Sequence, residues 1–64
     1  MVTRIKEIRD KKKITQEELS VKSGISRAII SALETGKATV TTNITMQKIA
    51  EALDEDVAVV FFGA

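Results

Sequence analysis

Few side chains in this sequence of 64 residues could carry out covalent chemistry. The sequence contains no cysteine and no histidine, so it lacks the thiolate nucleophile, the commonest general base and the commonest metal ligand. Its grouped carboxylates, Glu17 with Glu18 and the run 54–56, stand at expected helix starts and surface turns. Its three glycines form no phosphate-binding loop. We therefore expect a protein that is not an enzyme and has neither a metal site nor a cofactor.

The residue types favour binding instead, and the segment GISRAIISALETG is the most informative. Two glycines bracket an expected helix whose buried stripe is formed by Ile29 or Ile30 together with Leu33. A surface helix usually carries long charged side chains on its outer face. This outer face carries Ser26, Arg27, Ala28, Ser31 and Ala32. All of these side chains except Arg27 are short. Such a face suits close approach to a partner.

Arg27 is the one residue on this face with the reach and the fork geometry for a bidentate contact with guanine. Two alternatives are a phosphate contact and an ion pair with Glu17 or Glu18. Charge is distributed unevenly along the chain. The net charge is +4 over residues 1–13, zero over 14–37 and −3 over 38–64. A basic end is typical of a polyanion-binding face, although a solvated charged helix is the plainer alternative.

Helix signals recur along the chain. We expect helices over about 2–12, 16–23, 26–35 and 43–53. The second helix has a capping box, Thr15 with Glu18, and Ile14 precedes it as a hydrophobic staple. The final apolar run VAVVFF is rich in β-branched residues and predicts a strand over 57–62.

The second and third helices form a helix-turn-helix arrangement because only a tight glycine turn joins them. Ser20 supplies the small residue where two steeply crossing helices touch, and Gly24 stands where the chain must take a positive φ. Ile25 fills the turn, while Ile30 and Leu33 anchor the third helix to the core.

These residues together resemble a known family. The stretch IKEIRDKKKITQEELSVKSGISRAIISALETGK resembles the lambda-repressor-like (Cro/repressor, XRE) helix-turn-helix family, and MQKIAEAL resembles the next helix of that family. The likeness covers about residues 4–53. It implies a mostly α bundle of four to five helices that binds the major groove of operator DNA, usually as a dimer.

The resemblance also implies roles for particular residues. Ser26, Arg27, Ala28, Ser31 and Ala32 would face the major groove, and Gln16 would lie against the DNA backbone or the outermost base pair. The expected phosphate contacts are Gln16, Lys37, Thr39 and Thr41, with some of Arg4, Lys11, Lys12 and Lys13. For the three lysines, simple solubility is an equal alternative. Arg9 and Glu34 match the structural salt bridge of the family.

Lys13 and Asp54 depart from the family pattern because each stands where a glycine is common. We therefore expect both to take a positive φ, which is easier for Asp than for Lys. The apolar tail is a further departure, since many relatives have a short amphipathic helix there.

The expected tail strand would leave an apolar edge exposed. We predict that two copies pair these strands antiparallel through Val57, Val59, Val60, Phe61 and Phe62. The alternative is a monomer whose tail packs entirely on its own helices.

We expect one domain over 1–64, with the helix-turn-helix at 15–36 and a dimerisation strand at 57–62. The expected function is sequence-specific transcription regulation by a cytoplasmic protein that has no membrane segment. In the simplest form it is a homodimeric repressor on a palindromic operator in double-stranded DNA. The alternative is an antitoxin-type protein-interaction module that captures a protein partner with the tail.

Overall fold

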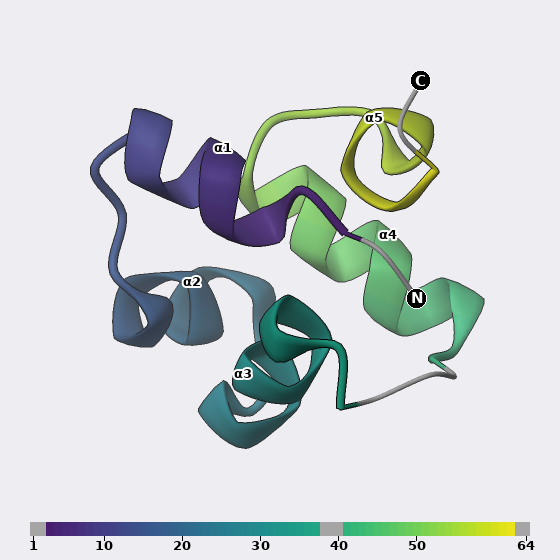
Figure 1. Cartoon of the computed structure of the whole chain (residues 1–64), viewed down its shortest axis with the longest axis horizontal. Coiled ribbons are helices and arrows are strands. Elements are labelled where there is room, and N and C mark those ends of the chain that lie inside the picture. The colour runs from purple at the N-terminus through teal and green to yellow at the C-terminus, as the bar shows by residue number, and fades with distance from the viewer. Residues whose placement is uncertain (1–2, 38–40, 63–64) are drawn as a thin grey trace.

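A computed structural model describes residues 3–37 and 41–62. Over these ranges the chain forms helices α1 (Ile5–Lys11), α2 (Gln16–Ser23), α3 (Arg27–Thr35), α4 (Asn43–Ala52) and α5 (Val57–Phe61). Helix α4 runs through the middle of the bundle, with α1 and α5 on one side and α2 and α3 on the other (Figure 1). The expected mostly α fold is confirmed.

Three helices begin at hydroxyl caps, of which the sequence analysis named Thr15. The Thr15 hydroxyl accepts from the backbone N–H of Glu18 at 3.0 Å, and the Glu18 carboxylate accepts from the Thr15 N–H, which completes the capping box. This hydrogen bonding lowers the pKa of Glu18. Ser26 caps α3 and Thr42 caps α4 in the same way.

The helix ends explain the unusual Lys13 and Asp54. After α1, the Lys13 N–H donates to Asp10 O at 3.1 Å and the Ile14 N–H donates to Arg9 O at 2.9 Å. This Schellman motif requires a left-handed residue at its centre, and Lys13 takes φ 58°. The same pair of bonds closes α4, where Asp54 takes φ 56°. Both expected positive φ values are confirmed.

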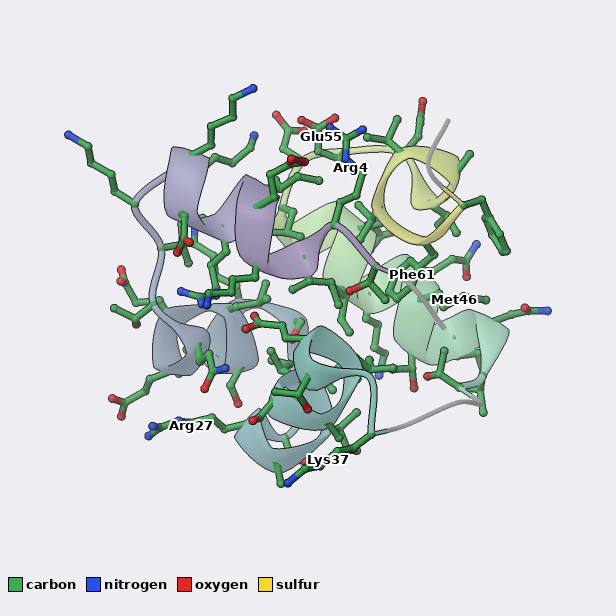
Figure 2. All side chains as sticks on the ribbon, viewed as in Figure 1. Arg4, Arg27, Lys37, Met46, Glu55 and Phe61 are labelled. Carbon is green, nitrogen blue, oxygen red and sulfur yellow. The ribbon has the colours of Figure 1, made fainter. Side chains whose placement is uncertain are left out.

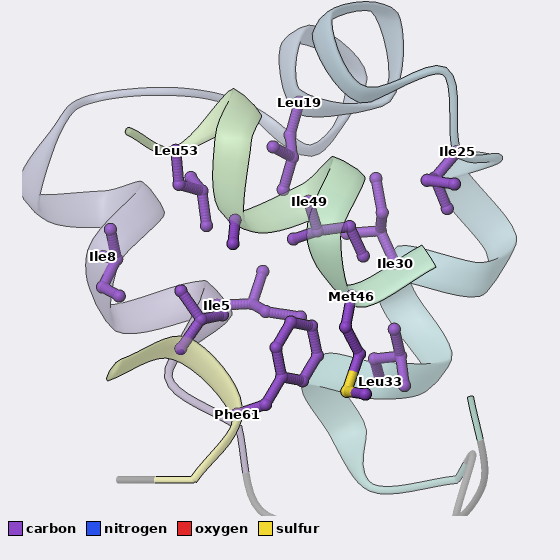
Figure 3. Close-up of a cluster of buried hydrophobic side chains, with 12 residues drawn as sticks. Ile5, Ile8, Leu19, Ile25, Ile30, Leu33, Met46, Ile49, Leu53 and Phe61 are labelled. Carbon is purple, nitrogen blue, oxygen red and sulfur yellow. The ribbon is translucent and has the colours of Figure 1, made fainter. Parts of the chain in front are cut away.

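One apolar cluster holds the helices together (Figure 3). It decides between Ile29 and Ile30, because Ile30 is buried while Ile29 is 45% exposed; on α4, Met46 is buried while Ile44 is 64% exposed. Each of the five helices contributes to it. Its members are Ile5, Ile8, Leu19, Ile25, Ile30, Leu33, Met46, Ile49, Ala50, Leu53, Val60 and Phe61.

The prediction of a strand over 57–62 is wrong, because residues 57–61 form α5. The run begins at Asp56, whose carbonyl accepts from the N–H groups of Val59 and Val60. Val60 and Phe61 are 0% and 3% exposed, so one face of the short helix completes the core. Burial of these side chains outweighs the β preference of Val and Phe, which is a weak and context-dependent tendency.

The tail helix is also held by a backbone bond from the other end of the chain. The Arg4 N–H donates to Val60 O at 2.8 Å. α5 packs against both α1 and α4. Burial of Val60 and Phe61 also contradicts the expectation that they form part of a dimer surface, because both side chains are enclosed by their own subunit.

Lys13→Gly should stabilise the domain by roughly 0.5–1 kcal/mol, because glycine removes the strain of a side chain at positive φ. Lys12→Gly is the matched control, since Lys12 lies one residue earlier with φ −91° and should gain nothing. The measurement is the free energy of unfolding in urea, followed by circular dichroism. Equal effects of the two substitutions would contradict the account of the α1 end.

Candidate nucleic-acid interface

The turn between α2 and α3 is fixed by two serine side chains. Ser20 Oγ donates to Ile25 O at 2.7 Å, and Ser23 Oγ accepts from the Ile25 N–H at 3.2 Å. Gly24 takes φ 73° between them, and Ile25 is 9% exposed. Gly24 and Ile25 take the conformation and the burial expected of them, and Ser20 adds a hydrogen bond that the sequence analysis did not predict.

The outer face of α3 is open to solvent. Arg27 and Ala28 are exposed, and Ser31 and Ala32 are half-buried. Ser26 is exposed, but its hydroxyl accepts from the Ile29 N–H at 3.2 Å as the helix cap. Apart from Arg27, the face therefore consists of short, uncharged side chains.

Arg27 points away from the bundle, on the same side of the molecule as Lys37 (Figure 2). Within residues 3–37 and 41–62, no carboxylate oxygen lies within 4.0 Å of its guanidinium. The alternative in which Glu17 or Glu18 holds Arg27 is therefore not observed. The guanidinium is available to a ligand.

Behind this face, a nearly buried carboxylate joins three helices. The side chain of Glu34, on α3, is 3% exposed, and that of Arg9, on α1, is 12% exposed. Arg9 Nε donates to Glu34 Oε2 at 2.9 Å, and Arg9 Nη2 donates to Oε1 at 3.3 Å. These bonds raise the pKa of Arg9, although burial opposes the shift. The salt bridge between the first and third helices has the partners that the sequence analysis named.

Gln16, at the start of α2, is the third member of this cluster. Its Nε2 donates to Glu34 Oε1 at 3.0 Å, and the residue is half-buried. The sequence analysis expected Gln16 to lie against the DNA backbone or the outermost base pair, and it missed the bond to Glu34. The two residues lie 18 positions apart, and no local spacing rule connects them.

The flanking phosphate candidates are less uniform. Lys37 is exposed and Thr41 is half-buried, while Thr39 lies outside the described residues. Arg4 Nε donates to Glu7 Oε2 at 2.8 Å, so its guanidinium already has a partner.

The three candidate lysines at the end of α1 are all exposed, namely Lys11, Lys12 and Lys13. Lys12 Nζ lies 3.9 Å from Glu55 Oε2. Phosphate contact by these lysines stays a prediction, with solubility as its alternative.

A comparison with protein-family models identifies the family of this chain. A helix-turn-helix model matches residues 5–60, which is most of the chain. The chain belongs to the lambda-repressor-like helix-turn-helix family. It is accordingly a DNA-binding regulator of the helix-turn-helix class. No curated protein matches the chain.

The match extends through α4 and into α5, beyond the stretch on which the sequence resemblance was based. A sequence signal for α5 does exist: Val57, Val60 and Phe61 follow the i, i+3, i+4 spacing of one helical face. No helix within residues 3–37 and 41–62 is long and apolar enough to cross a membrane.

Glu34→Ala should lower the free energy of unfolding by about 2–3 kcal/mol, because it removes the buried counter-charge of Arg9 and leaves only the exposed Asp10 carboxylate, 3.6 Å from Arg9 Nη1. Glu17→Ala, which removes an exposed carboxylate, should change the free energy of unfolding by less than about 0.5 kcal/mol. Urea unfolding of both variants at pH 7 checks this. A loss no larger for Glu34→Ala than for Glu17→Ala would show that the buried salt bridge contributes little.

Proposed function

We propose that this helix-turn-helix protein regulates transcription by inserting α3 into the major groove of a specific operator, most simply as a repressor. The observation that carries the proposal is the open outer face of α3, on which Arg27 has no carboxylate partner within the described residues. Occupying a promoter is sufficient to block it. The simplest mechanism therefore requires no chemistry beyond binding.

The short side chains on α3 fit this role. The major groove of B-DNA is about 12 Å wide and admits one helix. Ala28 and Ala32 allow the helix axis to approach the base edges, and their methyl groups can contact thymine methyls. Ser31 can bond to a base edge or a phosphate. Sequence discrimination then depends on Arg27, on methyl contacts and on DNA shape.

Affinity would come mainly from contacts with phosphates beside this helix. Lys37 follows Gly36, the C-cap of α3, and lies with Arg27 along the lower edge of the molecule in Figure 2. Gln16, Thr39 and Thr41 are the neutral candidates. These side chains would fix the position of α3 in the groove without reading sequence.

Arg27→Ala should relax the preference for one base pair in each bound site, because a bidentate contact with guanine contributes about 1–3 kcal/mol of discrimination. Arg27→Lys is the charge-matched control: it should keep most of the affinity but also lose that preference, since an ammonium lacks the fork geometry. The measurement is selection of bound duplexes from a random DNA pool for all three proteins. An unchanged preference in Arg27→Ala would overturn base reading by Arg27.

We further propose that the protein binds as a dimer, now without strand pairing. Two large apolar side chains are exposed, Ile44 at the start of α4 at 64% and Phe62 at the end of α5 at 67%. Val57 and Val59, on α5, are half-buried. Apolar surface of this kind favours a protein partner. A second copy would place two α3 helices on half-sites one DNA turn apart, roughly 34 Å.

The same exposed side chains support the second candidate function, an antitoxin-type module in which another protein occupies this surface.

Phe62→Asp should abolish dimerisation, because it places a charge in the apolar contact. Val21→Asp is the control, since Val21 on α2 is 80% exposed and lies outside the proposed surface. Sedimentation equilibrium gives the mass. A wild-type monomer at all concentrations would exclude the dimer and favour the second candidate.

A further inference from the structure

We infer that Glu34 is a positioning residue for DNA binding, in addition to being half of a salt bridge. Its carboxylate holds the side-chain amide of Gln16 so that the amide presents its second N–H to a DNA phosphate. This inference rests on the proposed DNA contact of α2 and α3. It assigns Glu34, which is nearly buried and touches no DNA, a defined effect on affinity through one neighbour.

The orientation of the Gln16 amide follows from the chemistry of its partner. An ionised carboxylate only accepts hydrogen bonds, so the NH₂ group of Gln16 must face Glu34 Oε1, where Nε2 lies at 3.0 Å. The opposite orientation would set two acceptor oxygens against each other. One N–H of the amide is therefore used, and within residues 3–37 and 41–62 the second N–H has no acceptor.

A phosphate is likewise an acceptor, so it can bond Gln16 only through that second N–H. A glutamine side chain on an open helix surface loses rotamer freedom when it binds. Here the bond to a charged group has already restricted that freedom, which reduces the cost of ordering on contact with DNA. Polarisation of the amide by the carboxylate also strengthens its second donor.

The carboxylate can hold Gln16 because Arg9 holds the carboxylate. Arg9 bonds both oxygens of Glu34, and its Nη1 donates to Ile14 O at 2.8 Å, just before the start of α2. The same guanidinium therefore fixes the end of α3 and the chain that enters α2. The phosphate donor on α2 is held at a set position relative to the base-reading face of α3.

A double-mutant cycle tests this role, with Gln16→Ala, Glu34→Gln and the double variant compared by fluorescence anisotropy. The probe is the fluorescein-labelled duplex that wild type enriches in the selection above. In Glu34→Gln, one amide oxygen replaces two carboxylate oxygens. Because Arg9 is charged, its guanidinium should keep the hydrogen bond to this oxygen, and Gln16 should lose its acceptor. All four proteins carry Asp54→Gly, which relieves the positive φ of Asp54 and offsets lost stability, and circular dichroism checks their folding.

We expect each single substitution to weaken binding by about fivefold to tenfold, the effect of one hydrogen bond. We expect the double variant to bind no more weakly than either single one. Glu17→Gln, on α2, removes the same charge without touching the cluster and should not weaken binding. A general charge effect would instead make Glu34→Gln bind more tightly, since it removes a negative charge.

Two results would overturn the positioning role while DNA binding stands. One is a Glu34→Gln effect of the same size with and without Gln16, which would show that Glu34 acts through the fold alone. The other is no effect of either single substitution. If wild type enriches no duplex at all, the proposed function fails as well.

The variant Gln16→Met offers a second check. It keeps the length of the side chain, removes both amide donors and should bind DNA as weakly as Gln16→Ala.

Discussion

The Glu34 carboxylate is the point at which three helices of this domain are joined by polar bonds. It lies almost out of solvent and accepts from Arg9 on α1 and from Gln16 on α2. A buried charge costs several kcal/mol unless it is paired and fully hydrogen-bonded, so these partners cannot be lost independently. The apolar cluster stabilises the bundle, while the hydrogen bonds of this carboxylate fix how α1, α2 and α3 are oriented. Direction comes from the polar bonds because burial alone is non-directional.

A chain of 64 residues has little apolar surface with which to stabilise itself. This protein uses a large share of its aliphatic residues in one cluster that draws on all five described helices. The short α5 matters for this reason, since Val60 and Phe61 close the cluster on the side of α1 and α4. The N-terminal segment is fastened to the same place by the bond from Arg4 to Val60.

The division between core and outer face also explains how one helix can both fold and bind. Ile30 and Leu33 of α3 are buried, while the opposite face of the helix carries mostly small side chains. Stability is supplied by the inner stripe and by Glu34, so the outer face is free to vary without unfolding the domain. Specific binding sites in a small protein need such a separation, because every core residue is already committed.

Local signals in the sequence determined the helices from α1 to α4 and the turn between α2 and α3. The capping box at Thr15, the cap at Ser26 and the glycine at 24 act within a few residues, so the chain itself encodes α2, α3 and their junction. The left-handed Lys13 and Asp54 followed from family likeness and were found as expected. The exposed face of α3 could also be read from helical spacing, whereas its expected DNA contacts came from the family resemblance.

Tertiary structure decided what local signals could not. Six apolar residues at the end of the chain suit a strand by propensity, but α1 and α4 offer a surface that buries Val60 and Phe61 only if the run is helical. The choice of Ile30 over Ile29, and of Met46 over Ile44, likewise depends on which side the neighbouring helices occupy. The bond from Gln16 to Glu34 exists because α1 brings Arg9 between two distant segments. Such contacts follow from packing in three dimensions, which residue spacing along one chain does not contain.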